Sequence, residues 1–588
     1  MRLKTLFCLA LSATAMMAGS ATARTYFVDA SNGKDDNDGS SESTAWRSIS
    51  KVNGTNLQPG DVVRFKSGEI WREELAIKND GVSGIPVMYE AYGNGPKPII
   101  TAADLFVDWT PTPGADNVWQ TTTPTQTRIV VFDGELGKET TARLSVDREF
   151  EWYWENNILY VYSTVDPAQL YREPGVEVGV RNNAIFGNAR NYYTIDGLDL
   201  RGANGKQNSG AGLLLGGDYV TIKNCTFVHN FYAGIHAADA ADNGTVINCE
   251  IHHNQDNGIA LGRGTGWSVS DCKIFSNGYG PRVRSGILFD TRNTTISRCI
   301  IYDNGNGSTE LGLTHGIYVN PTAVNVTIED CVIYDHRNGN GINYDANSGN
   351  IRRNYIFNNY FSGIHLENQD AGGQISIYNN IVYGNNTGIM LYEWQWNPGT
   401  KVNIFNNTLY ENNRYLLVAG KVDQEPYELC ILANIKELKI CNNIFYKSSP
   451  YVAIYAVKQS HIFSDNNCIY KSVEPNGPSC SYDGKTITFN DWQTATGGDA
   501  HSLAIDPQFV SGPKNQPPHF KLNCTSPCRG IGATSVSAIV TKDFEGRPFD
   551  GRDIGAFLVS CDNDDLQAPR RSVNMKARMK KKPRTPQN

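Results

Sequence analysis

The sequence is poor in charged residues and, beyond its first twenty or so positions, contains no long apolar run. Asp, Glu, Lys and Arg together make up 19% of the 588 residues, and the net charge is −7. That balance gives no reason to expect nucleic acid as a partner. A membrane span needs about 20 consecutive apolar residues, so we expect no span after the N-terminus. Gly and Tyr are abundant instead, which is typical of a turn-rich all-β protein and argues against disorder.

The N-terminus has the organisation of a secretory signal peptide. Arg2 and Lys4 precede an apolar run from Leu6 to Ala18, and small residues follow at Ala21-Thr22-Ala23. This pattern predicts a signal peptide over residues 1–23 and a mature chain that begins near Arg24. The protein is therefore expected to be secreted or to lie in the periplasm or at the cell surface.

One short phrase recurs between Gly258 and Glu393, at a spacing of roughly two dozen residues. Each copy is a glycine followed by four residues in which apolar and outward positions alternate. The copies begin at Ile259, Ile287, Ile317, Ile342, Ile364 and Ile389. Alternate side chains of a strand point to opposite faces, so the first and third residues are buried and the second and fourth point outward. The fixed period predicts a β-solenoid.

Two further strand-like phrases accompany each copy of the repeat. Val326 to Cys331 is an example of one, and Ile301 to Asn304 is an example of the other. Three strands per coil predict a three-sided solenoid, and successive coils predict parallel pairing. The fold class expected from the sequence is therefore an all-β, three-sided parallel β-helix with an N-terminal cap and a small β-rich insertion.

The repeat and its interruptions divide the chain into segments. After the signal peptide we expect an N-terminal cap with the first strands over 24–104 and a β-rich insertion over 105–180. The parallel β-helix with its groove follows over 181–475, then a C-terminal cap over 476–562 and a basic, disordered tail over 563–588. In the first cap, Trp46, Ile49 and Val52 lie at helical spacing, which predicts a short amphipathic helix over Thr44 to Val52.

Cysteine and asparagine share one position of the repeat. The cysteines there are Cys225, Cys249, Cys272, Cys299 and Cys331, and the asparagines of later rungs are Asn354, Asn380, Asn407 and Asn443. Neighbouring rungs lie about 4.8 Å apart, so we expect a buried column of free thiols that continues as an asparagine ladder. Cys480, Cys524, Cys528 and Cys561 lie outside the repeats and are the better disulfide candidates.

The glycine-isoleucine tetrads, the Cys/Asn column and the ending from Asp553 to Ala556 together resemble a known family. They are similar to the secreted right-handed parallel β-helix proteins of the pectin-lyase-like superfamily, over roughly Thr25 to Val559. That superfamily includes polysaccharide lyases, glycoside hydrolases and uronate epimerases. The resemblance therefore implies carbohydrate chemistry without choosing the reaction.

The outward fourth positions of the tetrads form a column rich in carboxylates and amides. In order they are Gly262, Asp290, Asn320, Asp345, Glu367 and Tyr392. Asp345 and Glu367 occupy adjacent rungs, about 4.8 Å apart, whereas Asp290 and Asp345 are separated by about 9.6 Å. Retaining glycosidases hold two carboxyl groups about 5–5.5 Å apart and inverting ones about 6.5–9.5 Å apart, so both pairs suit hydrolysis. We expect a glycoside hydrolase that needs no cofactor, with His315 and His365 as assisting groups.

Calcium binding is an alternative for the same column, because hard cations bind carboxylate and amide oxygens. The ligands would be Asp290, Asn320, Asp345 and Glu367. Ca²⁺ would then serve a lyase that acts on pectate or another uronate glycan, for which the resemblance implies a Lys or Arg base. No lysine occupies an outward tetrad position in the central rungs, which leaves Arg263 and Arg284 as the candidates.

A third alternative is a non-catalytic, glycan-binding surface protein whose outward column only keeps this face solvated. All three interpretations have a polysaccharide or oligosaccharide as the partner, and we expect a monomer. The residues expected to contact the sugar are Arg263, Arg284, Tyr318, Asn320, Asn343, Tyr392, Glu393, Trp394 and Trp396. The two tryptophans offer flat apolar faces on which sugar rings can pack.

Overall fold

The computed structural model describes most of the chain between residues 22 and 559. The gaps within that range are 206–208, 239, 279–283, 306–313, 368–371, 393–399, 414–415, 419–420, 425, 434, 448–450, 459–461, 474–478 and 511–516. The basic tail and all but two residues of the expected signal peptide lie outside the described residues. No helix in the described part is long and apolar enough to cross a membrane.

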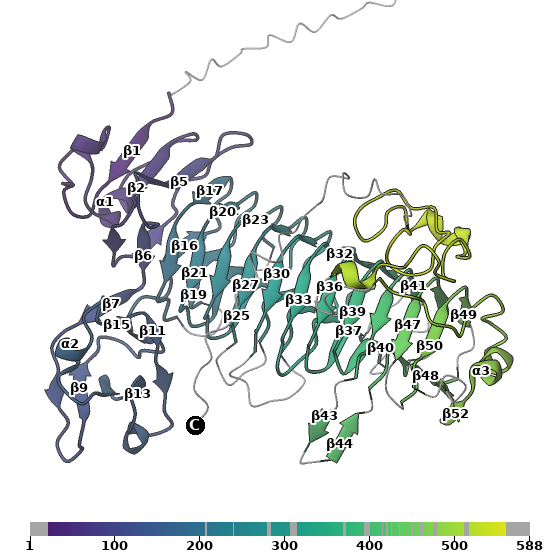
Figure 1. The fold of residues 1–588 in the computed structure, drawn as a ribbon. Coiled ribbons are helices and arrows are strands. Elements are labelled where there is room, and N and C mark those ends of the chain that lie inside the picture. Colours follow the sequence, from purple (N-terminus) through teal and green to yellow (C-terminus); the bar gives the residue numbers. More distant parts are fainter. Residues whose placement is uncertain are drawn as a thin grey trace, which may run out of the picture.

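Three long sheets form the sides of a prism and make up most of the described chain (Figure 1). Sheet A, as we call it, has 14 described strands from β1 (Thr25–Val28) to β49 (Ile462–Asp465). Sheet B has 13, from β3 (Ile70–Trp71) to β50 (Cys468–Lys471), and sheet C has 14, from β4 (Leu75–Ala76) to β52 (Lys485–Ile487). Pairing within these sheets is parallel except at β52, so the expected three-sided β-solenoid is confirmed.

The chain passes through sheets C, A and B in turn and then starts the next rung. The central strands of sheet C are β25 (Asn257–Leu261), β28 (Ile287–Phe289), β31 (Ile317–Val319), β34 (Ile342–Tyr344), β37 (Ser362–Leu366) and β40 (Thr387–Leu391). Those of sheet A are β26 (Ser268–Ser270), β29 (Thr295–Ser297), β32 (Val326–Glu329), β35 (Gly349–Arg352), β38 (Gln374–Tyr378), β41 (Lys401–Phe405) and β46 (Glu437–Cys441). Those of sheet B are β27 (Lys273–Phe275), β30 (Ile300–Tyr302), β33 (Val332–Tyr334), β36 (Tyr355–Phe357), β39 (Ile381–Tyr383) and β42 (Thr408–Tyr410).

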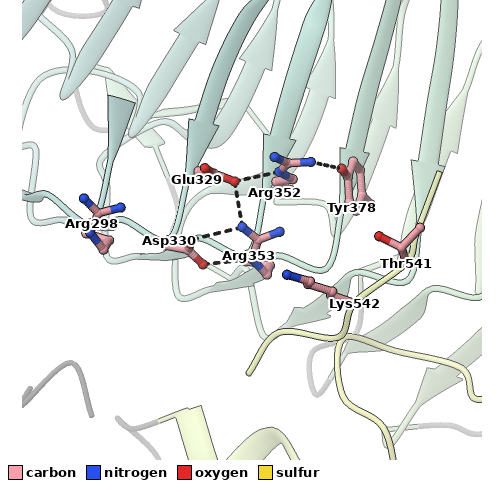
Figure 2. Close-up of a pocket in the computed structure, with 8 residues that line it drawn as sticks. All are labelled: Arg298, Glu329, Asp330, Arg352, Arg353, Tyr378, Thr541 and Lys542. Carbon is pink, nitrogen blue, oxygen red and sulfur yellow. Dashed lines mark hydrogen bonds and ion pairs between the residues drawn. The ribbon is translucent and has the colours of Figure 1, made fainter. Parts of the chain in front are cut away.

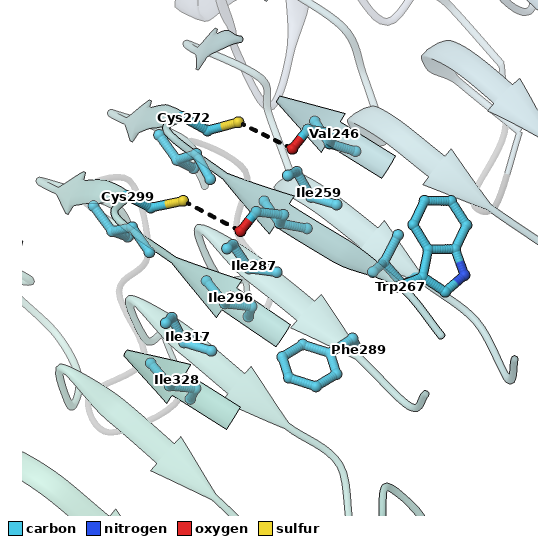
Figure 3. Close-up of a cluster of buried hydrophobic side chains, with 14 of the residues drawn as sticks. Val246, Ile259, Trp267, Cys272, Ile287, Phe289, Ile296, Cys299, Ile317 and Ile328 are labelled. Atoms are coloured by element: carbon cyan, nitrogen blue, oxygen red, sulfur yellow. Dashed lines mark hydrogen bonds between the residues drawn. The ribbon is translucent and has the colours of Figure 1, made fainter. Parts of the chain in front are cut away.

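The core of the prism is a set of stacked apolar columns. Figure 3 shows Ile259, Ile287 and Ile317 of sheet C one above another, with Ile296 and Ile328 of sheet A packed against them. All five are fully buried, and the register pairs Ile259 with Ile287 and Ile287 with Ile317. Burying one such side chain contributes about 1.5–3 kcal/mol, which each added rung repeats.

The glycine before each tetrad is required by the close approach of the next rung. A Cβ built at Gly286 would lie 2.7 Å from the carbonyl oxygen of Gly316, and one at Gly316 would lie 2.5 Å from that of Gly341. No side chain fits at these distances. Glycine recurs here because only a residue without a side chain leaves room for the backbone of the next rung. It therefore lets the strands of sheet C pair without distortion.

The shared Cys/Asn position forms the buried column that the sequence predicts. The five repeat cysteines are free and buried, and the Cys272 and Cys299 thiols each donate a hydrogen bond to a carbonyl of the preceding rung. In later rungs the amide of Asn354 donates to Asn380 Oδ1, and that of Asn380 to Asn407 Oδ1, both at 3.0 Å. Because these thiols and amides have hydrogen-bond partners on a neighbouring rung, the buried column keeps its polar groups satisfied.

The N-terminal cap differs in detail from the sequence prediction. Helix α1 (Ile49–Asn53) begins later than expected, because the Ser48 side chain accepts a hydrogen bond from the Lys51 N–H and so caps the helix there. Trp46 precedes the helix, is buried, and forms a bridge with Val28 at the edge of sheet A. The cap therefore closes the first rung with an extended segment and one short helix.

An insertion of two small sheets leaves the solenoid between β6 (Ile99–Thr101) and β16 (Ile185–Asn188) (Figure 1). One sheet contains β7 (Ala103–Phe106), β10 (Val130–Phe132), β11 (Glu135–Leu136) and β15 (Val176–Gly179). The other contains β8 (Thr110–Pro111), β9 (Val118–Thr122), β12 (Lys138–Glu139), β13 (Glu151–Glu155) and β14 (Ile158–Tyr162), and α2 (Pro167–Leu170) follows them. Trp109, Phe132 and Trp152 fill a separate core here.

The C-terminal segment, after α3 (Phe489–Thr496), runs back along the outside of the last rungs (Figure 1). Asparagine side chains at the outer turn between sheets A and B hold it there. The amide of Asn406 donates to the carbonyl oxygen of Asp553 at 2.9 Å, and that of Asn442 to the carbonyl oxygen of Gly551 at 3.0 Å. The described C-terminal segment forms no β-sheet, so its peptide carbonyls need other hydrogen-bond partners, and these asparagines supply them.

The cysteines outside the repeats follow the sequence prediction only in part. Cys524 is disulfide-bonded, whereas Cys480 and Cys528 are free and buried, so the disulfide prediction for these two is wrong. Cys480 belongs to the solenoid core, on β51 (Cys480–Tyr482), and Cys528 packs in an apolar cluster with Cys468. Both thiols are used as small apolar groups. Cys561 lies outside the described residues.

Candidate functional site

The outward face of sheet C carries a compact polar cluster on three consecutive rungs. The register places Tyr318 of β31 beside Asn343 of β34, and Asn343 beside His365 of β37. Asp345 and Glu367 follow two residues after Asn343 and His365, so they form a second column next to the first. Strand alternation directs all five side chains to the same face.

Asp345 is at the centre of this cluster and is almost completely covered, with 2% of its surface exposed. Asn343 Nδ2 donates to Asp345 Oδ1 at 3.1 Å, and the Tyr318 hydroxyl also hydrogen-bonds the carboxyl. Burial, and then the nearby Glu367 carboxylate, raise the pKa of Asp345 to about 8, against the smaller, opposite effect of Tyr318. At neutral pH this carboxyl therefore holds a proton, as a general acid must.

Glu367 is the more accessible of the two carboxyls, with 23% of its side chain exposed. Burial raises its pKa as well, but by less than for Asp345. His365 Nε2 lies 3.9 Å from Glu367 Oε2, and burial lowers the pKa of His365 to about 4. The imidazole is therefore neutral near pH 7, and Glu367 has no cation beside it in this contact.

A chain of amide hydrogen bonds connects His315 to Asp345. The Asn340 N–H donates to His315 Nδ1 at 3.2 Å, Asn340 Nδ2 donates to Asn343 Oδ1 at 3.0 Å, and Asn343 donates to Asp345. Burial lowers the pKa of His315 to about 3, with the His365 charge as the next cause. Because Nδ1 accepts a hydrogen bond, the neutral His315 carries its proton on Nε2.

Asn340 is the member of this network that the tetrad pattern does not select. It precedes the glycine of its tetrad, and the neighbouring rungs also have a polar residue at this place, His315 and Ser362. The Ser362 N–H donates to Asn340 Oδ1 at 2.9 Å. Both ends of the Asn340 side-chain amide are therefore held by hydrogen bonds, the other through Asn343. A polar residue precedes the glycine in all six tetrads, and this repeated polar position was the available signal for the third column.

Asp290 lies apart from this cluster and has other partners. Its carboxylate is 3.5 Å from Arg263 Nε and accepts a hydrogen bond from the Thr322 hydroxyl. Arg284, the other expected sugar-binding arginine, forms an ion pair with Asp256 at 2.6 Å in which both side chains are largely buried. The structure thus pairs Asp345 with Glu367 and places Asp290 in a separate, ion-paired group two rungs away.

The expected calcium site at Asp290, Asn320, Asp345 and Glu367 stays a prediction. Among the described residues, no group of three or more His, Cys, Asp or Glu side chains is placed to hold a metal ion. Asp290 interacts with Arg263 and Thr322, while Asp345 is covered by Tyr318 and Asn343. A hard cation needs several oxygens that converge on one point, so calcium would have to draw these side chains away from their present partners.

The remaining predicted residues fall at the edges of the cluster or outside the described chain. The Tyr392 ring lies 5.7 Å from the His365 ring, and the Tyr318 ring lies 5.4 Å from that of His315. Asn320 is half-buried after β31. Glu393, Trp394 and Trp396 lie outside the described residues, so their role in sugar binding stays a prediction.

Comparison with known proteins supports the fold independently. Residues 183–349 and 312–424 match the family model described as right handed beta helix region. A structure of XylC in complex with xylose aligns with 91% of this chain and 99% of that chain, with 12% identity and a TM-score of 0.59. At this identity the likeness shows the fold alone. The chain therefore has the right-handed parallel β-helix fold that the resemblance implies.

Two further similarities involve carbohydrate-active proteins. The pectate lyase Pel9A aligns with 92% of this chain and 98% of that chain, with 15% identity and a TM-score of 0.43. A lacto-N-biosidase from Bifidobacterium longum subsp. longum is 37% identical over 84 residues, which are 13% of this chain and 5% of that protein. This chain therefore matches only a small part of the length of that curated relative.

Proposed function

We propose that the protein degrades carbohydrate and that it is a glycoside hydrolase with its active groove on sheet C. The observation that carries the proposal is the pair of adjacent carboxyls, of which Asp345 is buried and neutral near pH 7 and Glu367 is accessible. Two carboxyls with separated acidities are what glycoside hydrolysis requires. The segment shared with a lacto-N-biosidase supports the carbohydrate class.

The spacing favours the retaining form of the reaction. Asp345 and Glu367 follow paired strands, so they are separated by about one rung, or about 4.8 Å, close to the about 5–5.5 Å of retaining enzymes. In the first step the Glu367 carboxylate attacks the anomeric carbon while Asp345 gives its proton to the leaving oxygen. In the second step the Asp345 carboxylate takes a proton from water, which displaces Glu367 and restores both groups.

The neutral groups around the pair serve to hold it in place. Asn340 and Asn343 fix the Asp345 carboxyl, and Tyr318 donates a hydrogen bond that stabilises its anion after proton transfer. His365 beside Glu367 is neutral near pH 7, so it does not neutralise the nucleophile by ion pairing. The proposed reaction needs Glu367 to ionise below the pH at which Asp345 loses its proton.

Product analysis on a panel of polysaccharides and oligosaccharides tests the proposal. We expect new reducing ends without unsaturated, ultraviolet-absorbing products, and no loss of activity in a chelator. Asp345→Asn and Glu367→Gln should each lower kcat by about 10²-fold or more. The matched control is Asp290→Asn, a carboxylate on the same face, which should cost less than about tenfold because Asp290 is engaged by Arg263.

Three outcomes would contradict the proposal. Unsaturated products that require calcium would indicate a uronate lyase. Saturable glycan binding without any cleavage would indicate a binding protein. If Asp290→Asn lowered kcat as much as Asp345→Asn while Glu367→Gln stayed active, the catalytic pair would be Asp290 and Asp345. Their wider separation would indicate an inverting reaction.

A further inference from the structure

A second polar site lies on the outer turn between sheets A and B, away from the sheet C face (Figure 2). It is a pocket with a volume of about 390 Å³ that opens between the ends of sheet A strands and the C-terminal segment. The charged residues that line it are Arg298, Glu329, Asp330, Arg352, Arg353 and Lys542. Its volume is within the range of about 300–1,000 Å³ that is usual for small-molecule sites.

The charge of the pocket is opposite to that of the protein. Four basic side chains and two acidic ones line it, and Asp271 pairs with one of the arginines, which leaves an excess of one positive charge in a chain whose net charge is −7. Clefts lined by one sign of charge concentrate ions of the other sign. A local positive excess on an acidic protein therefore favours an anionic ligand.

Ion pairs hold the arginines of the pocket in fixed orientations. Arg353 Nε donates to Asp330 Oδ1 and Arg352 Nε donates to Glu329 Oε2, both at 2.8 Å. Arg298 binds the two oxygens of Asp271 on the preceding rung, at 2.9 and 2.7 Å. Planar guanidinium groups that are already oriented lose little entropy when they bind an oxyanion.

Donors remain once these pairs are made. Within the described residues, Arg353 Nη1 makes no hydrogen bond and Lys542 Nζ makes no ion pair. Figure 2 shows the Lys542 side chain extending from the C-terminal segment toward the Arg353 guanidinium. The Arg353 side chain is only 10% exposed, so its charge is poorly screened. Arg353 is itself paired with Asp330 and Glu329, so an anion in the pocket would chiefly stabilise the charge of Lys542.

We propose that this pocket binds the carboxylate or sulfate group of an acidic sugar. Arg298, Arg353 and Lys542 would contact the oxyanion, and the remaining volume would hold the sugar ring. The choice of an anion rests on the charge and geometry of the pocket, whereas the choice of a sugar rests on the proposed function. The pocket would then retain the acidic part of a branched or long glycan while sheet C acts on another part.

Calorimetric titration of the full-length protein tests this proposal with four probes: galacturonate, galactose 6-sulfate, galactose and inorganic sulfate. We expect one or both acidic sugars to bind saturably, more weakly as salt is added, and galactose not to bind. Lys542→Met keeps the aliphatic stem and should weaken binding about tenfold, the scale of one charge-assisted contact. Lys439→Met is the matched control, because Lys439 is on the outer face of β46, where it pairs with Glu437.

Other results of the titrations would contradict the proposal. Equal binding of galactose, or no binding of either acidic sugar up to about 10 mM, would show that no acidic-sugar site exists. Inorganic sulfate that binds as tightly as both acidic sugars would make the pocket a simple anion site. Binding that is lost in Asp345→Asn and unchanged in Lys542→Met would place the sugar on sheet C. None of these results depends on whether the protein cleaves glycans.

Discussion

At the scale of single residues, the carboxyl of Asp345 lies where its neutral form is favoured. Its pKa is about 8 in the folded protein and about 3.9 in an unfolded chain, so between these pH values the folded state binds one more proton. The free energy of unfolding therefore falls as the pH rises through this window, by at most about 1.4 kcal/mol per pH unit. Keeping the Asp345 carboxyl protonated near neutral pH therefore lowers the free energy of unfolding.

Replacement of this residue should reveal that cost. Asp345→Asn keeps the shape and the hydrogen bond with Asn343 but cannot ionise, so we expect the variant to be more stable than the parent protein at pH 8. The cost begins only where the unfolded chain ionises, above its pKa of about 3.9, so the two proteins should be nearly equal at pH 4. Thermal unfolding of both proteins from pH 4 to pH 8 measures the difference. A difference that does not grow with pH would show that Asp345 is ionised in the folded state.

At the scale of one strand, the glycine before each tetrad sets how closely the rungs stack. Gly316→Ala would place a Cβ 2.5 Å from the Gly341 carbonyl oxygen and 2.4 Å from His336 Nε2. We expect overpacking to cost about 1–3 kcal/mol and to displace Tyr318, which follows in the same strand. Gly54→Ala is the control, because its Cβ meets nothing closer than 3.5 Å and its φ is negative. Equal melting temperatures for the two variants would contradict the packing account.

The strand pattern explains why the fold is predictable from the sequence and the site less so. Period-two alternation and the repeated glycine are local signals, so the stacked isoleucines such as Ile317 and Ile342 follow directly. The burial of Asp345 depends on Tyr318 and Asn343, which parallel pairing brings beside it from positions far along the chain. Sequence spacing placed Asp290 and Asp345 in one column, but it could not show that Arg263 engages the first.

At the scale of the whole molecule, the C-terminal segment is held by one column of outer asparagines. In Asn442→Ala the bonds to the carbonyl oxygens of Gly551 and Ala533 are lost, and so is the bond from the Ala533 N–H. We expect the C-terminal segment to become sensitive to limited proteolysis while the solenoid stays intact. The matched control is Asn248→Ala, since Asn248 has the same left-handed backbone but its side chain donates to Asn224, far from the C-terminal segment. Equal protease resistance in both variants would show that the segment is held elsewhere.

The segments outside the solenoid were the hardest to foresee, because irregular chain gives no periodic signal. Cys480 and Cys528 lie outside the tetrads, yet one completes the solenoid core and the other an apolar cluster under the C-terminal segment. The N-terminal helix was predicted to include Trp46, but the Ser48 cap starts it later. Tertiary packing decides the state of the two cysteines, whereas the local Ser48 cap decides where the helix begins.

The central claim is that Asp345 is a protonated acid whose state depends on Glu367. The most direct test is a pH titration by ¹³C NMR of protein labelled at the aspartate carboxyl carbon, with Asp345→Asn used to identify the signal. We predict a midpoint near pH 8, and a lower midpoint in Glu367→Gln, because that variant removes the charge that raises the pKa of Asp345. A midpoint below about pH 5 in the unmodified protein would contradict the account.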